Sequence, residues 1–462
     1  MCIYMYKIDF NKPIHVHFIG IGGISMSGLA EILIKEGFTI SGSDDRRSAL
    51  TEHLEKMGAS VFYPLKASNI MDGIDVAVYT AAIHEDNPEF AEVKNRGIPM
   101  LSRAELLGQL MTNYATPIAV SGTHGKTTTT SMLSHILLEA EKDPTISVGG
   151  ILNAIGGNIR VGNSDVFVTE ACEYTNSFLH FFPKIGIILN VEEDHMDFFK
   201  DIDDIRSSFH RFAALLPEDG ALVINKNIEE LSTITDGLNC KIITYSECQD
   251  ADYTAANITF DQLGNASFDL IRYGEYVDRI TLSVAGTHNV SNALSAIAVA
   301  DLLDISLESI KKGILSFGGT VRRFQYKGER NGFTIIDDYA HHPTEIKATL
   351  TSAQNYPHKD IWCIFQPHTY TRTKAFFHEF AEALSLADHV ILADIYAARE
   401  TDTLGMSSEA LAEEIKKLGA DAYYLPSFEA IEEFVLEKVI HGDLLITMGA
   451  GDVVNIGESL LK

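Results

Sequence analysis

The sequence is poor in cysteine, in long apolar runs and in positive charge. Its cysteines are Cys2, Cys172, Cys240, Cys248 and Cys363, and no two of them form a Cys-x-x-Cys pair. A scattered, odd set of this kind is typical of reduced thiols in a cytoplasmic protein, so we expect no structural zinc. No stretch approaches the roughly 20 apolar residues that a membrane helix needs. Residues 1–10 lack the long apolar core of a secretory signal, and we therefore expect a cytoplasmic location.

Positive charge is scarce, since 36 Lys and Arg residues stand against 64 Asp and Glu residues, a formal net charge of -28 at pH 7. The phosphate backbone of a nucleic acid binds to a basic face, so we expect no nucleic-acid partner. A small anionic ligand is compatible with this charge, because backbone N–H groups, bound magnesium and a few basic side chains can hold it locally. Isolated basic residues beside glycine-rich turns therefore indicate where a small anionic ligand could bind.

The length of 462 residues predicts about three domains. Buried strand patterns, each followed by a turn and a helical period, begin at residues 14, 117 and 333. This alternation predicts three α/β domains, each with a mainly parallel sheet flanked by helices. Residues 242–284 alternate polar and apolar side chains, so we expect antiparallel strands in the middle domain. The predicted domains are 1–114, Rossmann-like; 115–319, of P-loop type; and 320–462, Rossmann-like.

A first glycine-rich turn, Gly20-x-Gly22-x-x-Ser25, lies between a predicted strand and a predicted helix. Asp44 follows at the end of the next strand, where a carboxylate can accept from a ribose hydroxyl. Ser25 stands where a dinucleotide site has its third glycine. The turn therefore predicts a nucleotide site without saying which nucleotide, and a tight strand–helix turn is the alternative.

A second glycine-rich turn, Gly122-Thr-His-Gly125-Lys126-Thr127, follows a buried strand and is the strongest local signal. Its backbone can cradle phosphates, Lys126 can bind the terminal phosphates, and the Thr127 hydroxyl can bind magnesium. The usual P-loop glycine six positions before the lysine is replaced by Val120. A capped helix with a surface lysine is the alternative, which two glycines and four consecutive threonines make a poor explanation.

ATP chemistry needs metal ligands on neighbouring strands of the same sheet. Glu170 ends one apolar run, and His195 follows another within an acidic cluster. The carboxyl ends of strands are where open α/β sheets place ligands. Glu170 could instead be a solvated acid, and the His195 cluster a capped helix start. Together with Lys126, these residues predict one ATP–magnesium site with Thr127, Glu170 and His195 as metal ligands.

The motifs together resemble the Mur ligase family over nearly the whole chain. Those shared, in the family's order, are Gly-Thr-His-Gly-Lys-Thr-Thr at 122–128, Glu-Ala-Cys-Glu at 170–173, Asp-His-Met-Asp at 194–197, Gly-Thr-His-Asn-Val-Ser-Asn at 286–292 and Asp-Asp-Tyr-Ala-His-His-Pro-Thr-Glu at 337–345. Segments 20–23, 26–30, 365–368 and 370–372 are similar to its alanine-adding branch. The resemblance implies an ATP- and Mg²⁺-dependent ligase that joins L-alanine to the lactyl carboxylate of UDP-N-acetylmuramate in cytoplasmic peptidoglycan precursor synthesis. It leaves a homodimer open.

By resemblance, the three domains in chain order bind the UDP-substrate, bind ATP, and close over nucleotide and amino acid. The implied nucleotide contacts are Gly122, Thr123, His124, Gly125, Lys126, Thr127, Thr128, His288, Asn289, Asn292, Arg323 and Asp338. The implied substrate contacts are Gly20, Gly22, Ser25, Asp44, Thr80, Ala81, Arg103 and Glu173, with Tyr339, His341 and Arg372 for the amino acid. The implied catalytic residues are Lys126, His195, Arg322 and His341.

Residue chemistry alone leaves several of these assignments open. Arg103 by itself is better explained as a surface charge. The amide-rich cluster at 286–292 suits a helix cap as well as an adenine edge. Arg322 and Arg323 form a basic pair from which a guanidinium could reach the γ-phosphate when the domains close. The titratable residues at 337–342 are too dense for packing alone, although one or two could cap a helix.

Three segments depart from the family's common patterns. Thr369 stands where alanine-adding enzymes often have a second arginine, so the amino-acid pocket could be arranged differently. Residues 206–211 contain no lysine of the kind that several Mur relatives carry as a carbamate, and this absence favours the alanine-adding branch. Residues 173–178 differ from the commoner Glu-Ser-Asp form, which bears on the assignment of Glu173.

Three rival functions are a ligase that adds a peptide to UDP-N-acetylmuramate in wall recycling, an NAD-dependent oxidoreductase and a nucleotide sensor. The first shares two domains with the alanine-adding ligase, but the 337–342 motif and Arg372 favour a free amino acid. An oxidoreductase has no use for Lys126 and Thr127. A sensor has no use for two acidic metal sites. The general base stays open between His195 and His341.

Overall fold

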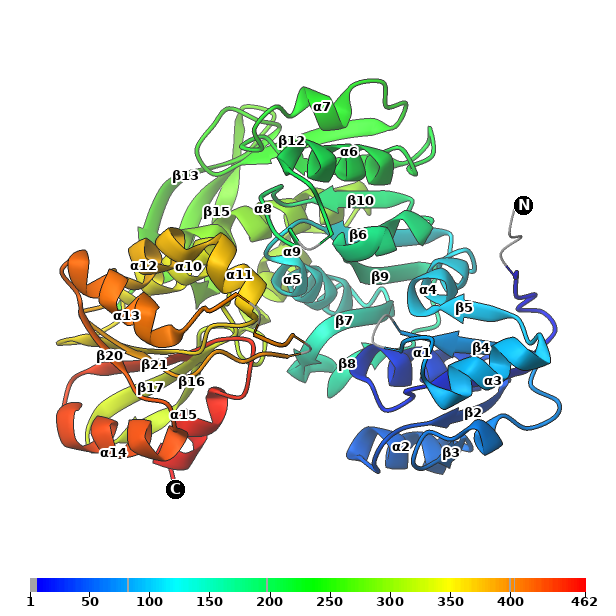
Figure 1. Ribbon diagram of the computed structural model, residues 1–462. Helices are drawn as coiled ribbons and strands as arrows, with labels where there is room; N and C mark the ends of the chain where they lie inside the picture. The colour runs from blue at the N-terminus through cyan, green and yellow to red at the C-terminus, as the bar shows by residue number, and fades with distance from the viewer. Residues whose placement is uncertain (1–5, 81–82, 197, 399, 403) are drawn as a thin grey trace.

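The chain folds into three α/β units, each built on its own sheet (Figure 1). The computed structural model describes residues 6–80, 83–196, 198–398, 400–402 and 404–462. The described cysteines, Cys172, Cys240, Cys248 and Cys363, are free thiols, and Cys2 lies outside the described residues. Within those ranges no helix is long and apolar enough to cross a membrane. The predicted fold class, three mainly parallel sheets flanked by helices, is confirmed.

The first sheet is parallel throughout, with the strand order β3-β2-β1-β4-β5. Its strands are β1 His15–Ile19, β2 Thr39–Ser43, β3 Ser60–Phe62, β4 Val76–Tyr79 and β5 Met100–Ser102. Its helices are α1 Ile24–Lys35, α2 Ala49–Met57, α3 Pro88–Arg96 and α4 Arg103–Met111, with a 3-10 turn η1 at Ala67–Asn69. The strand order reverses between β1 and β4, and such a reversal opens a crevice at the carboxyl edge, where the β1–α1 turn lies.

The central sheet has the order β15-β14-β13-β12-β11-β10-β6-β9-β7-β8. Its strands are β6 Thr116–Ser121, β7 Thr145–Leu152, β8 Gly157–Arg160, β9 Val166–Ala171, β10 Ile185–Ile188, β11 Ala221–Asn225, β12 Lys241–Ser246, β13 Tyr253–Phe260, β14 Asn265–Arg272 and β15 Glu275–Ala285. Its helices are α5 Lys126–Glu139, α6 Ile202–Ala213, α7 Ser232–Thr235, α8 Thr287–Leu302 and α9 Leu307–Ser316, with 3-10 turns η2 Asn153–Ile155 and η3 Tyr174–His180. The predicted antiparallel strands are β13, β14 and β15, whereas β12 pairs in parallel with β11 and β13.

The third sheet has the order β16-β17-β21-β18-β19-β20, in which β16 is antiparallel to β17 and the other neighbours are parallel. Its strands are β16 Gln325–Arg330, β17 Phe333–Asp338, β18 Ile361–Phe365, β19 His389–Leu392, β20 Asp421–Tyr424 and β21 Leu444–Met448. Its helices are α10 Pro343–Ala353, α11 Tyr370–Ala375, α12 Phe377–Leu384, α13 Ser408–Lys417, α14 Phe428–Lys438 and α15 Val454–Leu460. The three sheets lie within residues 15–102, 116–285 and 325–448.

Trp362, the single tryptophan of the chain, marks the amino-terminal edge of the third sheet. Its ring stacks on His389 at a centroid distance of 4.0 Å, and its indole N–H donates to Asp443 Oδ2 at 3.1 Å. Trp362 is the second residue of β18, His389 is the first of β19, and Asp443 directly precedes β21. Because these strands run in parallel, β17 and β18 end at the opposite edge, which is where open α/β sheets place ligands.

The first and central units pack closely at two glycines. A Cβ on Gly28 of α1 would lie 2.7 Å from Ile159 Cδ1, and one on Gly108 of α4 would lie 1.9 Å from the carbonyl oxygen of His180. Asn158 Nδ2 donates to the carbonyl oxygen at the start of α1 at 2.9 Å.

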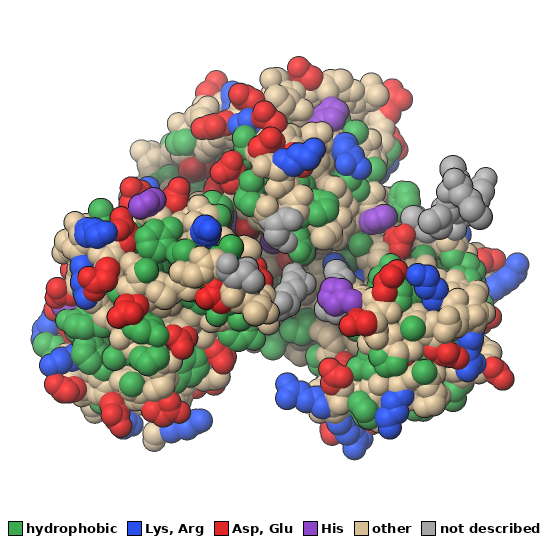
Figure 2. Space-filling model, viewed as in Figure 1, with side chains coloured by type: hydrophobic (Ala, Val, Ile, Leu, Met, Phe, Trp, Pro, Cys, Tyr) green, Lys and Arg blue, Asp and Glu red, His purple; other side chains and the backbone are tan. Residues whose placement is uncertain are grey.

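Figure 2 shows acidic side chains spread over the visible face of all three units, in keeping with the net charge of -28.

Candidate active site

The phosphate loop between β6 and α5 adopts a backbone that needs its glycines. Gly122 has a φ of 140° and Gly125 a φ of 82°, in a region that residues with a side chain rarely adopt. A Cβ on Gly125 would lie 2.7 Å from Asn292 Oδ1. Asn190 accepts from the His124 N–H at 2.7 Å and donates to the His124 carbonyl oxygen at 3.2 Å. Asn190 therefore holds the backbone of the loop at His124, just ahead of the first residue of α5.

Lys126 is anchored across this loop by buried partners. Its Nζ donates to the carbonyl oxygens of Gly122 and Thr123 at 2.5 and 2.9 Å, and to Glu173 Oε2 at 3.0 Å. Burial alone would lower the pKa of Lys126, but Glu173 raises it above its ordinary value. The ammonium is therefore charged, as phosphate binding requires. Glu173, which the sequence placed at the substrate, contacts this ammonium.

Glu170 ends β9 beside the phosphate loop. Its Oε1 accepts from the Gly149 N–H at 2.5 Å. Burial raises the pKa of Glu170, and hydrogen bonds from Gly149 and the Thr127 hydroxyl oppose that rise. A carboxylate next to a hydroxyl offers the oxygen ligands that Mg²⁺ prefers, so Thr127 and Glu170 fit such an ion.

His195 follows β10 and lies against the same buried acids. Its φ is 55°, and its Nε2 lies 3.7 Å from Glu173 Oε1 and 3.8 Å from Asp194 Oδ2. The ring of Tyr174 packs 4.5 Å from the imidazole, centroid to centroid. Burial lowers the pKa of His195, and the neutral imidazole is the form that binds a metal ion. Asp197 of the same motif lies outside the described residues.

A cavity of about 1370 Å³ lies between the central and third units. The predicted adenine contacts His288, Asn289 and Asn292 line one wall, at the start of α8. Asn289 Nδ2 donates to the Ala285 carbonyl oxygen at 2.7 Å, and Asn292 Nδ2 donates to Asn289 Oδ1 at 3.1 Å. Burial lowers the pKa of His288 to about 4, so its ring is neutral and can both donate and accept.

The adjacent arginines before β16 face different surroundings. Arg322 donates to Asp337 Oδ2 at 3.0 Å and to the carbonyl oxygens of Gly449 and Gly451 at 2.7 and 3.1 Å. Arg323 lines the cavity and donates to Glu345 Oε1 at 3.4 Å, and although burial alone would lower the pKa of Arg323, the charges of Glu345, Asp338 and Glu170 raise it. Arg323, rather than Arg322, is therefore the guanidinium that faces the phosphate loop.

The predicted amino-acid contacts gather where the third unit meets the segment after β10. Arg372 Nη2 donates to Asp194 Oδ1 at 3.0 Å. His341 Nδ1 lies 3.0 Å from the Tyr339 carbonyl oxygen, and burial lowers the pKa of His341 to about 4. Thr369 has a φ of 67° at the start of α11, three residues before Arg372. A protein carboxylate thus already pairs with the guanidinium that the sequence assigns to a substrate carboxylate.

Two further predicted site residues, Asp338 and Tyr339, lie at the end of β17 in the third unit. Asp338 accepts from the Ala340 N–H at 2.7 Å and the Phe324 N–H at 2.8 Å, and burial raises the pKa of Asp338 to about 6. Two guanidinium groups lie over the ring of Tyr339, with centroid distances of 5.0 Å to Arg322 and 5.5 Å to Arg323. Tyr339 therefore contacts both arginines through cation–π interactions.

The predicted UDP-substrate residues lie at the carboxyl edge of the first sheet. Gly22 N–H donates to Asp44 Oδ2 at 2.8 Å, so this carboxylate shapes the β1–α1 turn. Arg103 Nη1 donates to Ser25 Oγ at 3.1 Å, and burial lowers the pKa of Arg103. The plainer interpretation of Arg103 as a surface charge is therefore wrong. Gly20, with a φ of 81°, begins the turn.

Thr80 follows β4 at the same edge. The structure describes Thr80, which is half-buried, and Ala81 lies outside the described residues. The first unit therefore brings Gly20, Gly22, Ser25, Asp44 and Arg103 into one region beside the central unit, where the charge of Glu170 acts on Arg103.

Comparison with known proteins decides which family carries this arrangement. The chain matches the family descriptions "Mur ligase family, catalytic domain" over residues 15–115, "Mur ligase middle domain" over 120–300 and "Mur ligase, glutamate ligase domain" over 322–451. It is 60% identical to a UDP-N-acetylmuramate–L-alanine ligase of Lachnospira eligens over 459 residues, which cover 99% of this chain and 100% of that protein. The chain belongs to the Mur ligase family.

Other Mur ligases resemble it in sequence and in structure. A UDP-N-acetylmuramate–L-alanine ligase of Agathobacter rectalis is 61% identical over 99% of this chain and 100% of its own length. The crystal structure of a UDP-N-acetylmuramate-alanine ligase from Thermotoga maritima has a TM-score of 0.81 at 29% identity, covering 97% of this chain and 98% of that one. A murein peptide ligase from Psychrobacter arcticus has a TM-score of 0.70 at 25% identity, with the same coverage.

Two carboxylates of this Mur ligase that contact His124 were not among the predicted site residues. Glu345 Oε1 lies 3.3 Å from His124 Nδ1, and Glu192 Oε2 lies 3.6 Å from His124 Nε2. Glu345 had a sequence signal, because it closes the 337–345 motif and stands four residues after His341, one helical turn away. Glu192 belongs to the acidic cluster before His195, but that position does not indicate a contact with His124, which comes from another segment of the chain.

Proposed function

We propose that this Mur ligase joins L-alanine to the lactyl carboxylate of UDP-N-acetylmuramate, with ATP as the energy source. The observation that carries the proposal is the approach of the third unit to the phosphate loop. Gly125 and Thr128 of the loop and Arg323 of the third unit line one cavity, Lys126 lies in the same loop, and the charge of Glu170 on β9 acts on Arg323. His341 and Arg372, the candidates for amino-acid binding, lie on the same side of the third unit.

The first step activates the carboxylate. The lactyl carboxylate attacks the γ-phosphate of ATP, which gives an acyl phosphate and ADP. Lys126 and Arg323 offset the charge that spreads over the transferred phosphoryl group. Mg²⁺, held by Thr127 and Glu170 with His195 available to a second ion, supplies further charge neutralisation when bound.

The second step forms the amide. The uncharged amine of L-alanine attacks the acyl carbon, and inorganic phosphate leaves with the electron pair of the broken C–O bond. Arg372 binds the carboxylate of the amino acid in exchange for Asp194, a bidentate task that suits a guanidinium. His195 and His341 are the candidates to take the proton that the ammonium must lose, and burial lowers the pKa of both imidazoles, which weakens them as bases.

The third unit excludes water from the acyl phosphate. His342 Nε2 lies 3.1 Å from the Glu193 carbonyl oxygen, and Thr344 Oγ1 donates to Glu192 Oε2 at 2.7 Å. These contacts and the Arg372–Asp194 pair join the third unit to the segment after β10. We also place the reaction in the cytoplasm, as a step of peptidoglycan precursor synthesis. Whether the chain forms a homodimer is tested by analytical sedimentation of the purified protein at micromolar concentration.

A substrate panel tests the proposed function. Purified chain, ATP, Mg²⁺ and UDP-N-acetylmuramate are combined with L-alanine, glycine, L-serine or the tripeptide L-alanyl-γ-D-glutamyl-meso-diaminopimelate, and products are identified by mass. L-Alanine should give the amide with one phosphate released per product. Preferential use of the tripeptide would instead assign the chain to the recycling reaction, and phosphate release without any amide would contradict both.

A further inference from the structure

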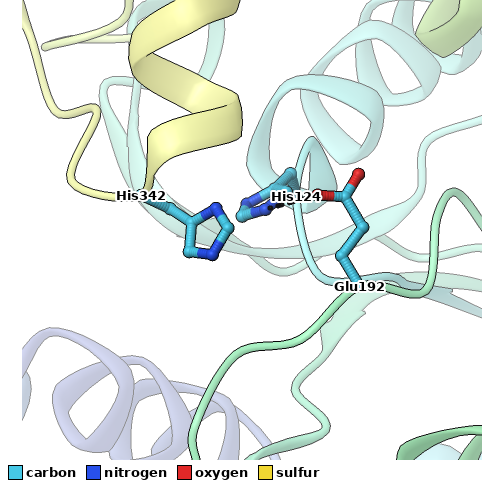
Figure 3. A group of neighbouring side chains, drawn as sticks. All are labelled: His124, Glu192 and His342. Atoms are coloured by element: carbon cyan, nitrogen blue, oxygen red, sulfur yellow. Dashed lines mark ion pairs between the residues drawn. The ribbon is translucent and has the colours of Figure 1, made fainter. Parts of the chain in front are cut away.

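The side chain of His124 joins the phosphate loop to two carboxylates on either side of an interface. Its Nδ1 lies 3.3 Å from Glu345 Oε1 on α10, and its Nε2 lies 3.6 Å from Glu192 Oε2 after β10. The ring packs against His342 with a centroid distance of 4.7 Å (Figure 3). Only 11% of the His124 side chain is exposed. A residue of the phosphate loop therefore contacts the third unit directly.

The surrounding charges favour the imidazolium form of His124. Burial alone would lower the pKa of His124, but Glu192 and Glu345 raise it to about 9. Burial would raise the pKa of Glu192, and His124 holds it below its ordinary value. The titratable and charged groups around His124 are Glu192 of the segment after β10, Glu345 and His342 of α10, and, behind Glu345, Arg323 and His341.

Glu345 is a junction between the two halves of the site. Its Oε1 lies 3.3 Å from His124 Nδ1 and 3.4 Å from Arg323 Nη1. Its Oε2 accepts from the His341 N–H at 3.1 Å and lies 3.3 Å from His341 Nδ1. One buried carboxylate thus contacts the phosphate loop, the arginine that faces it and the histidine on the amino-acid side.

His124, Glu192 and His342 also lie close enough together to hold a metal ion. Three contacts argue for a proton on His124 instead. His342 uses both ring nitrogens, since Nε2 lies 3.1 Å from the Glu193 carbonyl oxygen and Nδ1 accepts from the Thr344 N–H at 3.3 Å. Glu192 also accepts from the Thr344 hydroxyl. The positive charge between the two carboxylates is therefore that of His124.

We propose that His124 and Glu345 are paired positioning residues that couple docking of the third unit on the phosphate loop to the placement of Arg323 and His341. The inference rests on the proposed function for its reaction readout. When the third unit docks, the Glu345 carboxylate meets the His124 imidazolium. The same carboxylate then fixes the guanidinium and the imidazole on its other side, so the phosphate and amino-acid sites are ordered together.

A double-mutant cycle of His124→Phe and Glu345→Gln tests the coupling. The phenyl ring keeps the packing on His342 but has no charge, and the amide keeps the shape of the carboxylate. Each single variant should lower kcat about 10- to 100-fold, and the double variant should lose little more than either, because the two residues act as a unit. Glu382→Gln is the matched control, since it removes an exposed carboxylate from α12 of the same unit, and kcat should not change.

Hydrogen exchange gives a readout that does not depend on ligation. With a non-hydrolysable ATP analogue and Mg²⁺, residues 341–345 of the native chain should become protected. Glu345→Gln should still bind the analogue, but the protection of this segment should fall at least about 5-fold. If the native chain fails to ligate L-alanine, the proposed function is lost, whereas protection still tests the pair.

The native chain supplies a third measurement that needs no variant. Since the folded pKa of His124 lies above its ordinary value of 6.5, the contact is complete below that pH and is lost as pH rises through about 9. Analogue-induced protection, corrected for intrinsic exchange, should follow this curve, and Glu345→Gln should flatten it. Additive losses of kcat in the cycle, or protection that ignores pH in the native chain, would overturn the proposal.

Discussion

Arg322 and Arg323 are neighbours in sequence, yet their guanidinium groups serve different parts of the molecule. The three acceptors of Arg322 all belong to the third unit, so this side chain ties the start of that unit to the ends of β17 and β21. Arg323 faces the cavity and the charge of Glu170. The family resemblance implied a catalytic role for Arg322 and a nucleotide contact for Arg323, and nothing in a run of two arginines indicates which of them turns inward.

Replacing the two arginines separately should give opposite phenotypes. Arg323→Gln should lower kcat/KM for ATP about 100-fold with little change in thermal stability, because a charge facing the phosphates is lost. Arg322→Gln should mainly lower the free energy of unfolding, by about 2–4 kcal/mol, because three partly buried contacts are lost. Steady-state kinetics and thermal unfolding of both variants check this. A larger kinetic defect in Arg322→Gln than in Arg323→Gln would reverse the assignment.

Lys126 and Glu173 make a second prediction at this scale. Lys126→Ala should abolish ligation and also cost about 3–5 kcal/mol of stability, because Glu173 stays buried without its partner. Combining Lys126→Met with Glu173→Gln should recover most of the stability and none of the activity. Chemical denaturation and product mass measure the two effects. Substantial product from either variant contradicts the role given to Lys126.

Two glycines with the same left-handed backbone, one in the phosphate loop and one in the β14–β15 turn, have different surroundings. Gly125 and Gly274 share a φ of 82°, but a Cβ on Gly125 would meet Asn292, whereas nothing lies within 4 Å of one on Gly274. Gly125→Ala should therefore weaken ATP binding at least about 10-fold, and Gly274→Ala should cost only about 1 kcal/mol of stability without affecting ATP. Isothermal titration with an ATP analogue compares the two. Equal affinities would show that the loop tolerates the methyl group.

At the scale of helices and strands, motifs within a short segment were predicted better than contacts between segments far apart in the chain. The phosphate loop, its helix and the strand ends at Glu170 and His195 follow from spacing within short segments. The pairing of β12 was wrongly grouped with the antiparallel strands, because alternation along a strand does not say in which direction its neighbour runs. The contact of His124 with Glu345 could not be predicted, since it depends on how two separately folded units dock.

The whole molecule brings its ligand groups together from three sheets, so ligand removal should act on the site and not on the fold. Chelating Mg²⁺ should stop ligation and weaken nucleotide binding, because Thr127 and Glu170 then lack the cation that links them to the phosphates. The melting temperature of the nucleotide-free chain should not change. Differential scanning calorimetry with and without EDTA measures this, and a lower melting temperature would point to a structural ion.

Trp362 turns one end of the third sheet into a natural spectroscopic label. The chain has one tryptophan, so its emission reports on a single unit and leaves the other two silent. The indole is buried, stacked on His389 and bonded to Asp443, at the edge of the sheet opposite to the site. Nucleotide bound in the cavity therefore does not touch the indole. The change in tryptophan fluorescence during denaturation reports the unfolding of the third unit alone.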